Sequence, residues 1–195
     1  MVEQVNASVA ADAASANVDV ARAVRRIVTG HDANGRSTIL FDQTLADGPV
    51  PNDRYIWTSA ATPPSNLGSE DAAIAPHRLE PSVGGSVFRI VEFPPASVMA
   101  GMSAEAKESF FAGMFKGMGA SHCRVDTTRS PGMHQTATLD YVVMLRGELT
   151  LVLDDTETTL RPGDVVVQRG TNHDWVVRGN EPAMIAVVML SASNS

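Results

Sequence analysis

The feature that most constrains the fold is the spacing of short apolar runs after residue 121. Gly, Asp-Asp and Pro-Gly turn signals separate these runs, which cover residues 138–145, 148–153, 157–160, 164–168, 174–177 and 183–190. Closely spaced strands joined by tight turns are typical of a sandwich or closed barrel rather than of a parallel α/β sheet. The sequence therefore predicts an all-β domain.

The N-terminal part has a different composition. Residues 1–20 are rich in Ala, Ser, Asn and Asp and carry no apolar stripe, so we expect a mobile tail there. Residues 21–83 form a predicted N-terminal extension with short strands and loops. Asn34-Gly35 predicts a hairpin turn between two β-rich runs, because both residues tolerate positive φ. The strands expected in this extension cover residues 24–28, 37–41 and 54–58.

The predicted barrel covers residues 84–195 and begins with a strand at 86–93. It contains one helix, at about 104–118, with Ser103 as its N-cap. Apolar side chains recur at helical spacing along it: Phe110, Phe111, Met114, Phe115 and Met118. This stripe either docks the helix on a core or makes the helix a lid over a pocket mouth.

Charge and hydropathy exclude several classes of protein. The formal net charge of −7 and the pI near 5.1 argue against nucleic-acid binding, which needs clustered Lys and Arg. No run approaches the roughly 18 to 20 apolar residues of a membrane span, and the N-terminus lacks the pattern of a secretory signal. Cys123 is the single cysteine, so an intramolecular disulfide is excluded. We expect a cytoplasmic protein.

Residues typical of a metal site occur on one predicted strand and after another. Alternation along a strand places His134, Thr136, Thr138 and Asp140 on the same face, and His173 follows a turn further along the chain. Two imidazoles and one carboxylate can hold a divalent metal and leave positions open for a substrate. The alternative is a metal-free site in which Asp140 accepts a hydrogen bond from Thr136 or Thr138.

On these residues the sequence resembles the cupin superfamily. In its first motif His134 matches the first His, Asp140 stands at the Glu position, and Gly147 follows after six residues. In the second motif Gly163 matches the opening Gly and His173 matches the His. The resemblance implies a double-stranded β-helix, which is a barrel of the jelly-roll type. It also implies metal binding by His134, Asp140 and His173, and a homodimer.

The sequence departs from the cupin pattern at three places. Thr136 occupies the position of the second His, and Asp140 replaces Glu and is one methylene shorter. Residues 169–172, Arg-Gly-Thr-Asn, replace the Pro-x-Gly loop and are one residue shorter before His173. The resemblance is therefore more specific for the fold than for an activity.

Further side chains are candidates for the pocket. Thr136 could hold a metal-bound water through its hydroxyl, and Arg169 could bind a substrate carboxylate or form a surface salt bridge. Trp175 shares strand parity with His173, so it is either a pocket wall or part of the core. Two apolar residues continue the inward face of the first motif: Val142 and Met144.

Two more pairs leave alternatives open. Arg89 and Glu92 lie on opposite faces of one predicted strand, so one of them points inward. His122 and Cys123 could approach the metal site from the preceding segment.

The expected function is that of a metal-dependent enzyme acting on a small aromatic, carboxylate or carbonyl substrate. An Fe(II) oxygenase or oxidoreductase comes first, because two His and one carboxylate leave about three octahedral positions open. Zn, Mn or Ni in the same site would indicate a non-redox decarboxylase, isomerase or lyase. The third class is a small-ligand-binding cupin without catalysis. We expect no nucleic-acid or membrane partner.

Overall fold

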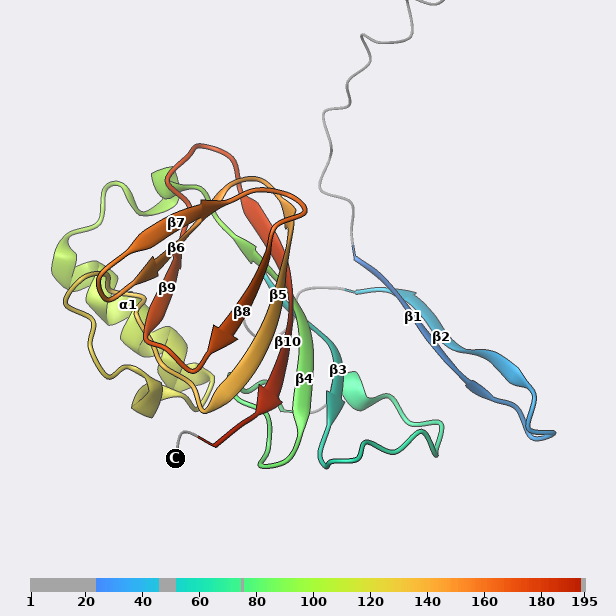
Figure 1. Ribbon diagram of the computed structural model, residues 1–195. Helices are drawn as coiled ribbons and strands as arrows, with labels where there is room; N and C mark the ends of the chain where they lie inside the picture. The colour runs from blue at the N-terminus through green and yellow to red at the C-terminus, as the bar shows by residue number, and fades with distance from the viewer. Residues whose placement is uncertain (1–23, 46–51, 75, 194–195) are drawn as a thin grey trace, which may run out of the picture.

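The computed structural model describes residues 24–45, 52–74 and 76–193, so the predicted tail at 1–20 lies outside the described residues. The described residues form ten strands and one α-helix: eight strands and the helix make a barrel-like body, and the other two strands form a β-hairpin that stands away from it (Figure 1). The all-β prediction is confirmed, and the predicted strands agree with the observed ones to within a few residues at their ends. In the described part of the chain, no helix is long and apolar enough to cross a membrane.

The projecting hairpin consists of β1 (Arg25–His31) and β2 (Ser37–Thr44). Its turn follows the prediction: Gly35 has φ of 74°, which glycine adopts without the steric penalty of a side chain. A buried ion pair between Arg26 and Asp71 fixes the base of the hairpin. Arg26 also donates to the Ile56 carbonyl at 3.2 Å, so this guanidinium links the hairpin to the body at two points.

The larger sheet has five strands in the order β3-β4-β10-β5-β8, all antiparallel. The strands are β3 (Asp53–Ser59), β4 (Ser86–Phe93), β10 (Ala183–Ser191), β5 (Thr138–Arg146) and β8 (Val165–Arg169). β3 comes from the predicted extension, yet it pairs along β4 as one edge of this sheet. The extension thus contributes a wall of the barrel.

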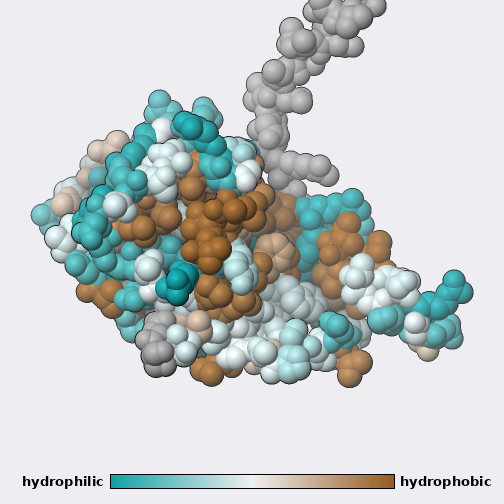
Figure 2. Space-filling view, in the orientation of Figure 1, coloured by the Kyte–Doolittle hydropathy of each residue, from teal (hydrophilic) through white to brown (hydrophobic). Residues whose placement is uncertain are grey.

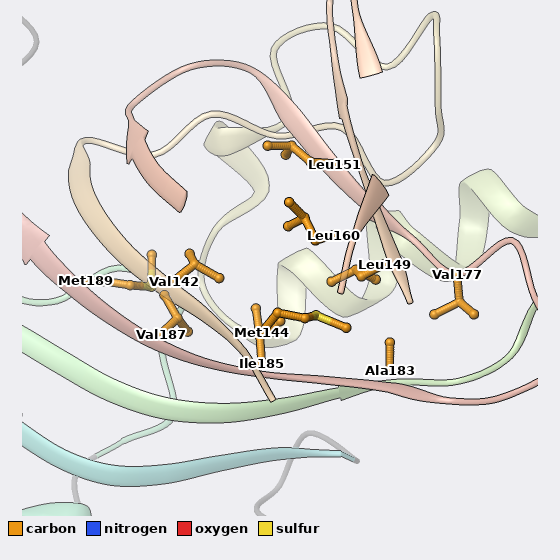
Figure 3. Packing of buried hydrophobic residues seen from close by; sticks show 10 residues of the cluster. All are labelled: Val142, Met144, Leu149, Leu151, Leu160, Val177, Ala183, Ile185, Val187 and Met189. Carbon is orange, nitrogen blue, oxygen red and sulfur yellow. The ribbon is translucent and has the colours of Figure 1, made fainter. Parts of the chain in front are cut away.

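The smaller sheet has three strands in the order β7-β6-β9. They are β6 (Leu149–Leu153), β7 (Glu157–Leu160) and β9 (His173–Val176). Side chains from the two sheets point toward one another and form the main core (Figure 3). Its members are Val142, Met144, Leu149, Leu151, Leu160, Val177, Ala183, Ile185, Val187 and Met189. Burial of this apolar surface holds the two sheets together.

The helix α1 (Ala104–Gly117) begins at the predicted cap, where the Ser103 hydroxyl accepts a hydrogen bond from Ala106 N. It lies beside the barrel (Figure 1) and docks on a second core, in which the Phe115 side chain is only 2% exposed. The other members of that core are Leu79, Met118, Ala120 and Cys123. Three short 3-10 helices complete the structure: η1 (Ala72–Ile74), η2 (Ala96–Met99) and η3 (Ser121–Cys123).

The outer face of β5 and β8 carries an exposed apolar row. Figure 2 shows apolar surface in the region where these strands lie in Figure 1. The row consists of Tyr141, Val143, Leu145, Val165 and Val167, each at least 40% exposed. Homodimer formation remains a prediction.

Candidate active site

The two predicted histidines meet inside the fold. His134 and His173 form an isolated antiparallel bridge, in which each main-chain N–H donates to the other residue's carbonyl at 2.9 Å. Their ring centroids are 4.3 Å apart. Phe115 of α1 packs on His134 at 4.9 Å, and Trp175 packs edge-on to His173 at 5.6 Å. Residues that are 39 positions apart in the chain therefore form one aromatic-flanked pair.

The surroundings fix the tautomer of His134. Nδ1 of His134 lies 2.9 Å from the carbonyl oxygen of Gly132, which only accepts hydrogen bonds, so Nδ1 carries the proton and Nε2 keeps a free lone pair. Nδ1 of His173 lies 2.9 Å from the carbonyl oxygen of Thr171 and 3.1 Å from the amide nitrogen of Gln168, so it faces both an acceptor and a donor. Burial lowers the pKa of His173 to about 4 and that of His134 well below its usual range. Neutral imidazoles oriented in this way are suited to metal binding.

Asp140 is a buried carboxylic acid with an incomplete set of partners. Its side chain is 4% exposed, and Oδ1 has no hydrogen-bond partner among the described residues. Burial raises its pKa to about 6, and the Thr138 hydrogen bond and the Arg89 charge offset part of that rise. Thr138 rather than Thr136 is thus the threonine that hydrogen-bonds Asp140. A positive charge nearby would favour the ionised form.

The fit of these residues to one metal ion is partial. A divalent metal with bonds of about 2.1 Å brings neighbouring ligand atoms to roughly 3.0 Å of one another in an octahedral site and ~3.4 Å in a tetrahedral one. Among the described residues, the group whose ligand atoms all lie within 4.8 Å of one another is a different one, Glu80 with His122 and Cys123. His134, Asp140 and His173 are therefore not gathered as closely as a shared metal requires. Joint binding by the three remains a prediction.

Thr136 lies in the interior with its hydroxyl engaged. It is 1% exposed, and its Oγ1 is 2.7 Å from Oγ1 of the buried Thr138. The role predicted for it, holding a metal-bound water, remains a prediction.

The other predicted pocket residues fall into two groups. Val142 and Met144, each 2% exposed, belong to the packed core, and Trp175 packs partly buried against the same cluster. Arg169 is exposed, because the preceding residue on β8, Gln168, takes the inward position opposite Asp140. Arg169 is therefore on the outward side of β8, and its contact with a substrate carboxylate remains a prediction.

Arg89 takes the inward position instead. It is 5% exposed, whereas Glu92 on the opposite face of β4 pairs with Arg146 at 2.9 Å. One guanidinium nitrogen of Arg89 donates to Asp53 Oδ2 at 3.0 Å, and another lies 3.3 Å from Met189 Sδ. Its charge acts on the pKa of Asp140. Both faces of β4 carry apolar residues, so strand alternation alone could not identify Arg89 as the inward one.

Asp53 connects Arg89 to the loop before β4. His77 Nε2 lies 3.0 Å from the same Asp53 oxygen, and the His77 ring stacks on Tyr55 at 4.3 Å. Asp53 Oδ1 is buried without a hydrogen-bond partner in the part of the chain that the structure describes. The Arg89 guanidinium is thus a buried cation with one carboxylate beside it.

Comparisons with known proteins agree with this architecture. Residues 122–189 match the model of the cupin domain. The cupin-domain-containing oxidoreductase fogC of Aspergillus ruber is 30% identical over 188 residues, which cover 90% of this chain and 75% of that protein. Phomopsin biosynthesis cluster protein C' of Diaporthe leptostromiformis is 32% identical over 79% of this chain and 70% of its own length.

One solved structure is compared with this chain. The cupin 2 conserved barrel domain protein of Salinispora arenicola is 15% identical, covers 77% of this chain and 92% of its own, and has a TM-score of 0.38. The family assignment rests on the fungal relatives and the domain match, together with the strand order and the paired histidines. This chain belongs to the cupin superfamily and is similar to cupin-domain-containing oxidoreductases.

Proposed function

We propose that this chain is a cupin oxidoreductase that acts on a small organic acid. It holds a divalent metal through His134 and His173, and Fe(II) is the first candidate for that metal. The observation that carries the proposal is the buried pair of neutral imidazoles, in which each Nδ1 lies 2.9 Å from a main-chain carbonyl. The names of fogC and its relative virC of Hypocrea virens support the oxidoreductase class. A bound iron would supply redox and Lewis-acid chemistry at this point.

The residues around the histidines can prepare a substrate. Phe115 and Trp175 pack on the two imidazole rings and exclude water from one side of each. Asp140 has a pKa of about 6, so its carboxyl group can take up or release a proton near neutral pH. These contacts support proton transfer within a partly dry site.

Arg89 is suited to an anionic substrate. It is a buried guanidinium, and its Nε–H has no hydrogen-bond partner in the described ranges. A substrate carboxylate would satisfy such a donor and add a negative charge beside a guanidinium whose hydrogen-bonded carboxylate is Asp53. Arg89 replaces Arg169 as the residue proposed to orient the carboxylate.

Oxygen uptake tests this function. Protein purified without oxygen and loaded with Fe(II) is mixed with a panel of small aromatic and aliphatic carboxylic acids, beginning with benzoate. We expect substrate-dependent oxygen consumption that is lost in His134→Ala and His173→Ala but kept in His31→Ala, an exposed histidine of the hairpin. Tight zinc, manganese or nickel with turnover of the same acids but no oxygen uptake would contradict the oxidoreductase and favour a decarboxylase, isomerase or lyase.

Benzoate binding tests the role of Arg89 separately. Replacement by Met keeps much of the side-chain length and removes the charge. We expect Arg89→Met to weaken benzoate binding by at least about tenfold, which corresponds to the ~1.4 kcal/mol of one charge-assisted hydrogen bond. Arg169→Met, on the exposed face, is the matched control and should bind as the wild type does. Equal loss in both variants would contradict the assignment.

A further inference from the structure

A second group of metal-ligating side chains lies apart from the barrel histidines. His122 Nε2 is 2.7 Å from Glu80 Oε2 and 3.5 Å from Cys123 Sγ. The three ligand atoms all lie within 4.8 Å of one another, and neither barrel histidine belongs to the group. Carboxylate, imidazole and thiol thus converge on one point.

The geometry differs from that of a catalytic triad. In a triad the imidazole uses one nitrogen for the nucleophile and the other for the carboxylate. Here the thiol and the carboxylate both contact Nε2 of His122, so no proton relay runs through the ring. Cys123 is also 1% exposed, which keeps its sulfur from a large substrate. A nucleophilic role is therefore excluded by the contacts themselves.

The same geometry is close to that of a zinc site. Tetrahedral zinc, with bonds of about 2.1 Å to nitrogen and oxygen and 2.3 Å to sulfur, separates nitrogen from sulfur by ~3.6 Å and nitrogen from oxygen by ~3.4 Å. The observed nitrogen–sulfur distance is 3.5 Å, and the nitrogen–oxygen distance of 2.7 Å is that of a hydrogen bond. Replacing the Nε2 proton by a cation requires the carboxylate oxygen to retreat by only ~0.7 Å.

The surroundings of the group are those of a fixed but accessible site. Ala137 N donates to Glu80 Oε1 at 2.8 Å, which orients the carboxylate and leaves Oε2 for the cation. Cys123 is held in the core beneath α1, whereas His122 has a side chain 67% exposed. The exposed His122 imidazole therefore leaves the group open to a cation from solvent.

We propose that Glu80, His122 and Cys123 form a second metal site, outside the barrel interior, for one borderline divalent cation of the zinc class. Binding releases the thiol proton of Cys123 to water and leaves the His122 imidazole neutral with its proton on Nδ1, so that Sγ, Nε2 and Oε2 hold the cation and a water completes the tetrahedron. The cation would join the loop before β4 to η3 and, through Ala137, to the segment that enters β5. The site would therefore clamp the edge of the barrel next to the histidine pair.

Cobalt gives this site its own signal. A thiolate bound to Co²⁺ produces a charge-transfer absorption in the near ultraviolet, and Cys123 is the only cysteine of the chain. The protein is stripped of metal, kept reduced with a non-thiol reductant and titrated with Co²⁺. We expect this absorption to saturate at one cobalt per chain and to disappear on addition of Zn²⁺, which binds such ligands more tightly.

Substitutions test whether all three side chains bind the cobalt ion. Cys123→Ser should abolish the absorption. Both His122→Ala and Glu80→Gln should weaken cobalt binding by more than about 100-fold. Removing a group that only orients a ligand costs less than this. Glu80→Gln keeps the oxygen that accepts from Ala137 N. The matched control His31→Ala, and His173→Ala in the barrel, should keep both the signal and the affinity.

Thermal unfolding supplies a second readout. Zn²⁺ should raise the Tm of the wild type, and this increase should be lost in His122→Ala, whose exposed side chain makes a folding defect unimportant. Absence of the thiolate–cobalt absorption in the wild type would overturn the proposal. So would an unchanged signal in both His122→Ala and Glu80→Gln, because cobalt would then bind Cys123 without the other two residues.

Discussion

Replacing Asp140 by Asn tests the electrostatics of the barrel interior. The folded-state pKa of Asp140 is about 6 against an ordinary value of 3.8, because burial disfavours the charged form. The raised pKa means that the folded state favours the protonated acid. The protonated Asp140 therefore adds to the free energy of unfolding in full below pH 3.8, and this contribution is lost as the pH rises through 6. Ionisation of Asp140 therefore destabilises the metal-free protein near neutral pH.

The magnitude follows from the two pKa values. At about 1.4 kcal/mol for each factor of ten in ionisation, Asp140→Asn should stabilise the metal-free protein by ~3 kcal/mol at pH 7.5 and by about half of that at pH 5. With a urea slope of ~2 kcal/mol/M, the midpoint at pH 7.5 should rise by ~1.5 M.

The assay is urea unfolding of chelator-treated wild type and variant at both pH values. The buried histidines are common to both proteins, so their titration cancels in the difference. Equal midpoints at pH 7.5 would refute the raised pKa. A gain of the same size at both pH values would show that packing or hydrogen bonding, rather than ionisation, causes the effect.

Three further predictions concern the same fold. In the Asp140→Asn background, lowering the pH from 6.5 to 4 should reduce the free energy of unfolding by ~3 kcal/mol from His173 alone. The pKa of His173 is depressed to about 4 in the folded state, so the unfolded chain takes up the proton first and stability falls. A free energy of unfolding that does not change with pH would contradict burial of the neutral ring. Phe115→Ala should cost about 3–5 kcal/mol of unfolding free energy, since the ring is 2% exposed; a loss below 1 kcal/mol would show that α1 is not docked. Gly147→Ala should lower the Tm more than Gly163→Ala. Both glycines have positive φ, but only at Gly147 would an added Cβ meet the backbone, 2.4 Å from the Pro182 oxygen. Equal decreases in Tm would show that the positive φ alone, and not this close contact, causes the loss.

Local patterns were sufficient to predict most of the fold. Apolar runs bounded by tight turns fixed the strands from β5 to β10, and the Ser103 hydroxyl caps α1 as its sequence position indicates. Parity along the first motif also placed Thr136 and Asp140 in the interior together. These features depend on interactions between near neighbours in the chain, which a single sequence displays directly.

Three features of the site depend on contacts that no local pattern contains. Arg89, rather than Arg169, points inward because β4 pairs with β10 and β3 in a register that buries this face. Strand parity places His134 and Asp140 on one face but does not give their distance from His173 on β9, so joint metal binding by the three remains a prediction. His122, whose approach to the metal site the sequence left open, contacts Glu80, 42 residues earlier. Such pairings are decided by the packing of distant segments.

Metal binding by the two barrel histidines is decided by the metal content of protein purified without oxygen from iron-supplemented cells. The protein carries His122→Ala, so that the outer group does not contribute. We expect nearly one iron per chain, lost when His134→Ala or His173→Ala is added and retained with His31→Ala. Metal that remains after both barrel histidines are replaced, or no metal even after reconstitution with Fe(II), would contradict a metal centre at this pair.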